Sequence, residues 1–320
     1  ELEVSGTVNN ILTELSDGQF TVARQIYENS NTLLKSLAQG EGLSGPVFLE
    51  AKEFFSDMAD FNHRYLLEEA FVATGGDAEV AEMVEKTVID AIPVQGILSH
   101  AYNGSVNANY RGNWDKACAL YIGQPSLGSS PYERAQKRGA NYGTMEGEVA
   151  NANVAILEAC NAGPSQSNYA TILKNIKITY AQSSIRYAHL LDIDFAEGLS
   201  TVDHRAEGQA FYRVIAPMVA SASSVCHDIM NELYSFDKDP DMSKKYYCEA
   251  VACIPSALDL SPSEMGTLEE TDGVCETATI INTPAGFFTP QTPVFVQLQV
   301  SATVNSIIEF LSQDDFTGAE

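Results

Sequence analysis

The 320-residue sequence predicts an all-α fold: two related helical bundles packed together, a loop-rich, disulfide-stapled C-terminal part, and a short strand near the C-terminus. Apolar residues recur at helical spacing along most of the chain, and clear alternation of apolar and polar residues occurs only in residues 294–300. Four of the six cysteines lie from Cys226 onward. Because 45% of the residues are hydrophobic, the chain can bury a large core.

The first half of the chain predicts a series of helices separated by Gly and Pro. Residues 7–39 fit two helices that break at residues 16–18, and residues 47–74 fit one or two more that end at Gly75 and Gly76. The further expected elements are a helix over residues 78–90 that Pro93 kinks or restarts toward residue 102, a loop over 103–112, and a helix over 114–122.

Ser130 and Pro131 predict the N-cap and first turn of another helix, with Glu133 placed as in a capping box. The same turn carries Arg134, Lys137 and Arg138, which share one helix face. An anion can bind to such a face, although a solvated basic face that pairs with some of the many carboxylates explains it as well.

The second half predicts longer helices. Two glycines interrupt the chain at 139 and 143, after which the helix resumes to Cys160. The next expected elements are a helix over residues 168–191, a loop over 192–200, a helix capped by Asp203 that runs to residue 234 with a kink at Pro217, and a short helix through Cys248 and Cys253.

The cysteines predict disulfides in an oxidising compartment. No two of them form a Cys-x-x-Cys pair, which argues against a zinc knuckle or a redox site, and their even number suits three disulfides. The alternative is six buried free thiols in a cytosolic protein. Asn103 begins an Asn-Gly-Ser sequon, so we expect a glycosylated, secreted or cell-surface protein. The expected disulfide residues are Cys118, Cys160, Cys226, Cys248, Cys253 and Cys275, with their pairing open.

The charge balance restricts the partners. With 18 basic and 43 acidic residues the net charge is −25, which makes nucleic acid and anionic membranes poor partners and cations better ones. No apolar run is long enough for a bilayer, so no direct membrane insertion is expected. None of the nucleophile, phosphate-loop or zinc-protease motifs occurs, and we therefore expect no enzyme.

The two ends of the chain resemble each other. Residues 2–23 align without gaps onto residues 298–319 with 12 identities, at an offset of 296 residues. The interpretation is one repeat unit over residues 1–297, with possible halves at about 1–163 and 164–297, followed by the start of a neighbouring repeat at 298–320. The alternative is a pseudo-symmetric pair of segments within one domain. A fainter match between residues 114–121 and 205–212 suggests that the halves are related.

His204 and Glu207 are the best-placed pair of metal-capable side chains. At i and i+3 on one helix they reach toward the same ion, and Phe211 and Ile215 continue their face, which points it into the bundle. The alternative is an ordinary hydrogen-bonded His and Glu. Further candidate ligands are Tyr212, eight residues on, and Tyr187 and Asp192 from the preceding helix and its end.

Residues 129–144 and 204–213 together resemble the algal iron-assimilation proteins, or phytotransferrins, over about residues 78–234. That resemblance implies a secreted or surface-held protein of ferric iron uptake, with carbonate bound beside the metal. The His-x-x-Glu pair is also similar to the iron-site motif of the two-bundle imelysin-like proteins. Only His204 and Glu207 carry over, since Val202 stands where those proteins have glycine.

The sequence thus favours an iron-binding or iron-assimilation-like domain of a tandem-repeat protein, which takes up ferric iron or another hard cation, with carbonate. The alternative is a structural repeat of an extracellular fibre, adhesive or matrix protein whose metal site has decayed. Its partners would then be neighbouring repeats of the same polypeptide.

Overall fold

The computed structural model describes residues 2–29, 32–107, 111–124, 127–237, 239–269, 271 and 275. It confirms the all-α prediction: among these residues the strands are limited to a short antiparallel hairpin of β1 (Met145–Glu146) and β2 (Val149–Ala150). The strand expected at residues 294–300 and the segment 298–320 lie outside the described residues.

The helices follow one another with short connections. The first part of the chain holds α1 (Leu2–Ser16), α2 (Phe20–Asn29), α3 (Leu33–Ala38), α4 (Pro46–Phe54), α5 (Phe61–Arg64), the π-helix η1 (Tyr65–Glu69), the 3₁₀-helix η2 (Ala70–Val72), α6 (Asp77–Lys86), the π-helix η3 (Thr87–Ala91), α7 (Ile92–Val106) and α8 (Arg111–Ile122). The second part holds α9 (Pro131–Tyr142), α10 (Asn151–Ala162), α11 (Gln166–Glu197), α12 (Val202–Ala222), α13 (Ser224–Tyr234), α14 (Tyr246–Ala257) and α15 (Pro262–Met265).

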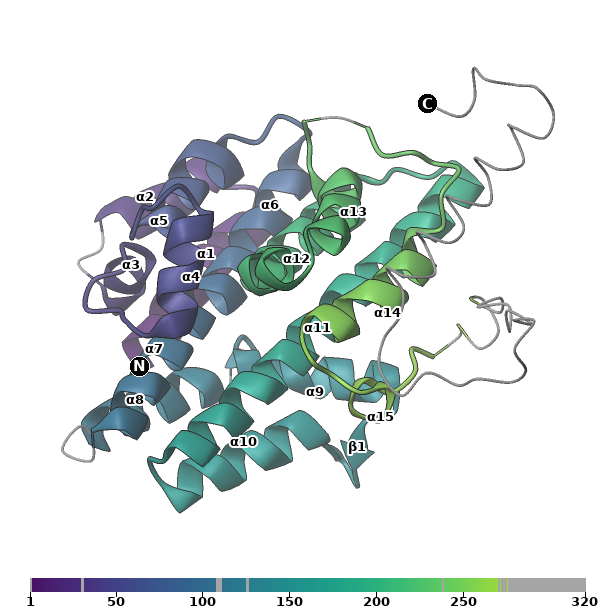
Figure 1. Cartoon of the computed structure of the whole chain (residues 1–320). Coiled ribbons are helices and arrows are strands. Elements are labelled where there is room, and N and C mark those ends of the chain that lie inside the picture. Colours follow the sequence, from purple (N-terminus) through teal and green to yellow (C-terminus); the bar gives the residue numbers. More distant parts are fainter. Residues whose placement is uncertain are drawn as a thin grey trace, which may run out of the picture. The chain divides into compact units, whose positions relative to one another are not determined.

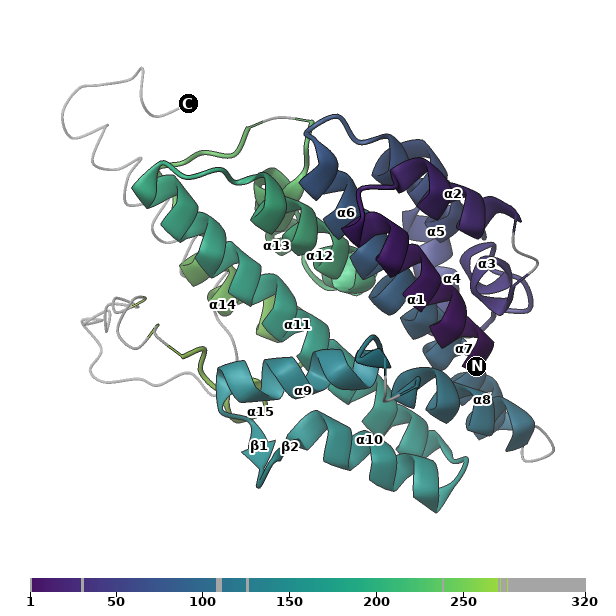
Figure 2. The ribbon, with the colours of Figure 1, turned by 180° about the vertical axis from the view of Figure 1, so that it is seen from behind.

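The long helix α11 organises the packing of residues 1–272, which form one compact unit. It contacts α7, α10, α12 and α14, and α12 contacts α6 and α13 in turn (Figure 1). From behind, α1 is seen beside α6, against which it packs (Figure 2). Helices of the first half of the chain therefore pack directly on helices of the second half.

Close contact between α12 and α13 depends on a glycine. A Cβ at Gly208 would overlap the ring of Tyr234, which is fully buried and donates its hydroxyl proton to the carbonyl of Ser184 on α11. The smallest residue therefore lets the Tyr234 ring lie directly on α12 while its hydroxyl is held by α11. Gly208 thus brings α11, α12 and α13 together just below the predicted metal pair.

Several predicted boundaries are wrong, and local geometry explains them. The expected loop over residues 192–200 is helical as far as Glu197, because the left-handed stop that ends α11 is Gly198, with φ 68°. Similarly, α7 continues through the Asn-rich residues to Val106. After Gly143, with φ 65°, the chain forms the β1–β2 hairpin before α10 begins, so the helix does not resume directly.

The predicted helix from residue 203 to residue 234 is two helices. Pro217 lies inside α12, and the break comes at Ser223, whose hydroxyl accepts a hydrogen bond from the amide of Cys226 and caps α13. Asp203 lies in the first turn of α12, where Thr201 holds the N-cap position. The N-cap predicted at Ser130 is confirmed, since its hydroxyl accepts from the amide of Glu133.

The prediction of three disulfides is confirmed. One joins Cys118 of α8 to Cys160 of α10, and another joins Cys226 of α13 to Cys253 of α14. Cys248 and Cys275 are disulfide-bonded as well. Three disulfides fit an oxidising environment. None of the helices in the described part of the chain combines the length and the apolar character needed to cross a bilayer.

Candidate metal site

The candidate site lies where α11 and α12 run side by side. The short turn after Gly198 folds α12 back along α11, and helices joined by so short a connection lie antiparallel. The last turns of α11 therefore face the first turns of α12. This brings Tyr187 and Asp194 opposite His204 and Glu207.

His204 is oriented by a buried carboxylate. Its Nδ1 lies 2.7 Å from Oδ2 of Asp194, which is buried, while the His204 side chain is 35% exposed. A carboxylate bound to one ring nitrogen fixes the ring and its tautomer, and metal-ligating histidines are usually held in this way. The arrangement leaves Nε2 of His204 without a hydrogen-bond partner among the described residues.

Glu207 and Tyr187 meet directly across the two helices. The hydroxyl of Tyr187 lies near the Glu207 carboxylate and helps to lower its pKa, and the Tyr187 ring lies 6.0 Å from the imidazole of His204 between centroids. The Tyr187 ring also stacks on Phe211, at 5.4 Å. Burial, followed by the charge of Glu207, raises the pKa of Tyr187, so the phenol keeps its proton at neutral pH.

Lys86, at the end of α6, binds the same carboxylate. Its Nζ lies 3.0 Å from Oε1 of Glu207, 2.5 Å from Oε2 of Glu82 and 2.7 Å from Oε1 of Glu85, and the residue is only 4% exposed. Burial alone would lower the pKa of Lys86, but the three carboxylates raise it above its usual value. The ammonium therefore occupies a point on which three carboxylate oxygens converge.

The carboxylates respond differently to this cation. Burial favours the neutral form of Glu207, yet the charge of Lys86 and the neighbouring Tyr187 hydroxyl hold its pKa below the usual value. For Glu82, burial outweighs Lys86 and the pKa is raised. Glu207 is therefore an anion in the folded protein, paired with the ammonium of Lys86.

A second buried charge network adjoins the first. Arg134 on α9 donates from Nε and Nη2 to the two oxygens of Asp90, at 3.2 and 3.0 Å, and the hydroxyl of Tyr180 donates to Asp90 at 2.8 Å. The Arg134 guanidinium also lies 4.5 Å from the ring centroid of Phe211. Asp90 belongs to the π-helix η3, a geometry that is rare and frequent at functional sites.

Arg138 is buried without a full set of partners. Its Nε and Nη1 have no hydrogen-bond acceptor among the described residues, and burial lowers its pKa to about 10, an effect that the nearby Tyr187 opposes. Arg134 and Arg138 both point into the protein and only Lys137 of that set is exposed, so the interpretation as a solvated basic face is wrong. The alternative, an anion near this helix face, stays a prediction.

Two predicted ligands lie elsewhere. Tyr212 follows His204 by eight residues, which turns it about 80° around the helix from His204. Its hydroxyl is hydrogen-bonded to Nδ1 of His227 at 3.0 Å. Asp192 accepts from the amides of Tyr246 and Tyr247, at 3.1 and 3.0 Å, and so caps the N-terminus of α14. Neither residue contributes to the cluster around Glu207.

Asn103, the predicted glycosylation site, lies on α7. Its Oδ1 accepts a hydrogen bond from the hydroxyl of Ser44 at 2.9 Å, which leaves its amide nitrogen, the atom that carries a glycan, outside this bond. Glycosylation there stays a prediction.

Taken together, the donors at this place are the phenol of Tyr187, the carboxylate of Glu207 and Nε2 of His204, oriented by Asp194. Among the described residues no three His, Cys, Asp or Glu side chains form a group that could hold a metal ion. Lys86 and Asp194 carry no sequence signal that points to this site. Comparison with protein-family models, with curated proteins and with solved structures gives no match.

Proposed function

We propose that this domain binds a hard cation of the ferric iron class, outside the cell, through Tyr187, His204 and Glu207. The observation that carries the proposal is that Tyr187 of α11 lies against both His204 and Glu207 of α12, with Asp194 fixing His204. Phenolate and carboxylate oxygens suit hard cations, and imidazole suits iron. The site is framed by rigid helices, as in other bundle-core metal sites.

Carbonate is the anion that we propose beside the cation. Arg138 supports this part of the proposal, because it is a buried guanidinium near Tyr187 whose Nε and Nη1 lack acceptors. A guanidinium presents its N–H groups in a plane that matches a planar, two-oxygen anion. A secreted or cell-surface location is consistent with the disulfides.

Cation binding would be coupled to proton release. The Tyr187 phenol must lose its proton to become a ligand, and Nε2 of His204 must be unprotonated. The cation would also compete with Lys86 for Glu207. Affinity is therefore expected to fall as the pH falls.

A structural repeat is the second candidate function, and Lys86 favours it. Its ammonium already balances Glu82, Glu85 and Glu207, so the cluster is satisfied without a metal ion. In that case the network would only hold α6 against α12. The two functions differ in whether the wild-type protein binds a cation at all.

Calorimetric titration with chelated ferric iron tests the proposal. The wild-type protein is expected to bind about one ion per chain, and the His204→Ala, Glu207→Ala double variant to bind it about 100-fold more weakly or not at all. His227→Ala is the matched control, since this half-buried histidine is hydrogen-bonded to Tyr212 outside the site. Equal affinities of the wild type and the double variant would favour the structural repeat.

A further inference from the structure

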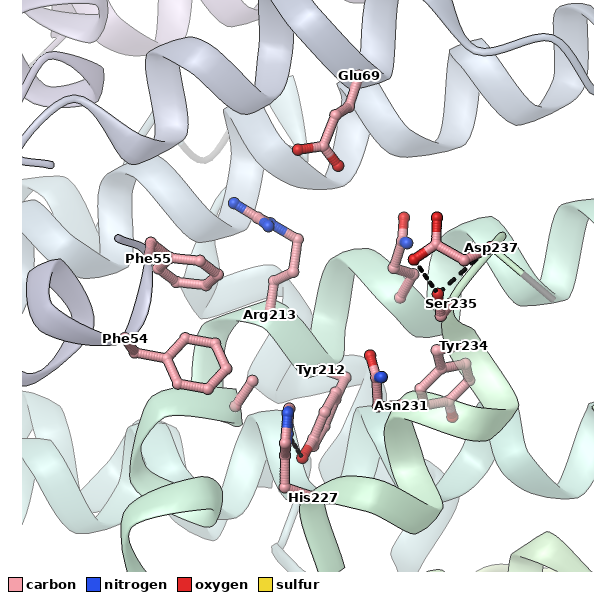
Figure 3. A pocket seen from close by; sticks show the side chains of 12 residues that line it. Phe54, Phe55, Glu69, Tyr212, Arg213, His227, Asn231, Tyr234, Ser235 and Asp237 are labelled. Atoms are coloured by element: carbon pink, nitrogen blue, oxygen red, sulfur yellow. Dashed lines mark hydrogen bonds between the residues drawn. The ribbon is translucent and has the colours of Figure 1, made fainter. Parts of the chain in front are cut away.

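A separate cavity of about 230 Å³ opens among α4, η1, α12 and α13 (Figure 3). Its lining includes Phe54, Phe55, Tyr212, Arg213 and His227, and none of the three proposed metal ligands. This volume and the aromatic lining suit a small organic molecule.

Arg213 is the charged group of this cavity. Its guanidinium carbon lies 3.7 Å from the ring centroid of Tyr65 and 4.4 Å from that of Phe55, so two aromatic rings pack on it. Its Nε is buried and has no hydrogen-bond acceptor within the described part of the chain. The ion pairs that arginines form in the described part of the chain involve four others, namely Arg24, Arg64, Arg134 and Arg205.

Burial disfavours the charged guanidinium and lowers the pKa of Arg213, and the nearby Tyr65 and Glu69 oppose this effect. The aromatic rings offset part of the cost of burial but accept no hydrogen bond in the guanidinium plane. Arg213 lines the cavity, and a carboxylate matches the planar fork of an arginine.

Several of the other residues that line the cavity are aromatic, which favours a ligand with an apolar body. Phe54 meets the imidazole of His227 edge-on at 5.3 Å, and that imidazole is held by the hydroxyl of Tyr212. Burial lowers the pKa of His227, so the imidazole is neutral and adds no second cation. Figure 3 shows Phe54 and Phe55 on one side of the cavity, with Arg213 beside them.

The rim limits the charge of the ligand. Glu69 and Asp237 are exposed at the cavity, and Asp237 is hydrogen-bonded to Ser235 (Figure 3). These carboxylates repel phosphates and dicarboxylates, which carry more than one negative charge.

We propose that this cavity binds a small organic monocarboxylate with an apolar or aromatic body. Its carboxylate accepts hydrogen bonds from Arg213, and its body lies against Phe54 and Phe55. The site is independent of the proposed cation site, so either can fail without the other.

The test compares isosteric probes on the whole protein, with a chelator present so that no metal takes part. 3-Phenylpropionate is expected to bind wild-type protein about 10-fold or more tightly than the neutral 3-phenylpropanamide, by calorimetry or ligand-observed NMR. Arg213→Met is expected to remove this preference and leave amide binding unchanged. Arg64→Met is the control, since Arg64 is an exposed arginine paired with Glu68.

Two results would overturn the proposal. One is equal affinity of wild-type protein for the carboxylate and the amide, and the other is no binding of either 3-phenylpropionate or hexanoate at millimolar concentration. Both results are measured on wild-type protein, so they test the proposal even if Arg213→Met does not fold.

Discussion

Replacing Asp90 with alanine is expected to lower the free energy of unfolding by about 3–5 kcal/mol, because the change leaves Arg134 as an unpaired cation in the interior. Asp90 is 0% exposed and accepts hydrogen bonds from Nε and Nη2 of Arg134 and from the hydroxyl of Tyr180. Burial alone would lower the pKa of Arg134, but Asp90 raises it above the usual value, so the guanidinium stays charged. Urea unfolding at neutral pH measures the loss.

Glu68→Ala is the matched control. Glu68 accepts from Arg64 at 2.9 Å in an exposed i,i+4 pair, and such pairs are worth less than about 1 kcal/mol. If Asp90→Ala cost no more than Glu68→Ala, the network of Asp90, Arg134 and Tyr180 would not be the buried anchor described above.

Lys86→Met is expected to destabilise the protein by about 3 kcal/mol at neutral pH, and by less as the pH falls. The change removes the cation on which three carboxylates converge, of which Glu207 is the most buried. The expected loss lies at the lower end of the range for breaking a buried ion pair, because Glu82 and Glu85 are partly in contact with water.

The pH dependence follows from the pKa directions. In the wild type Glu207 has a lowered pKa, so its contribution is present above the usual carboxylate pKa and is lost as the pH falls through the folded value. Lys86 has a raised pKa, so its contribution is present below the usual lysine pKa and is lost only as the pH rises through the folded value. Both contributions are therefore complete at neutral pH.

Without Lys86, burial instead raises the pKa of Glu207, and protonation then relieves the repulsion among the carboxylates. The gap between the wild type and Lys86→Met, measured by urea unfolding, is expected to be smaller at about pH 5 than at about pH 7. Lys52→Met is the control, since Lys52 pairs with the exposed Asp57. A gap of the same size at both pH values would contradict this account of Lys86.

The part of the site that lies on neighbouring helices was predictable. His204 and Glu207 share a face by spacing alone, and Tyr187 faces them because α11 and α12 form an antiparallel hairpin. Asp192, the other residue predicted from this helix, instead accepts hydrogen bonds from the first amides of α14. Asp194 lies two residues on, about 200° around the helix, and so faces His204 while Asp192 faces α14.

Long-range pairings were not predictable. Lys86 and Glu207 are far apart in sequence, and a lysine is seldom buried, so nothing local marks Lys86 as part of the interior. The burial of Arg134, which pairs with Asp90 on η3, and of Arg138 was not predictable from the sequence either. Their spacing on α9 identified a shared face but not that this face is turned inward.

The most direct measurement of the central claim is a visible absorption titration with chelated ferric iron, because iron bound by a phenolate absorbs visible light through charge transfer from the ligand to the metal. Wild-type protein is expected to develop this band, Tyr187→Phe to lose it, and Tyr212→Phe to keep it, since Tyr212 is hydrogen-bonded to His227 outside the site. Absence of the band in wild-type protein, or its survival in Tyr187→Phe, would contradict cation binding through Tyr187, His204 and Glu207.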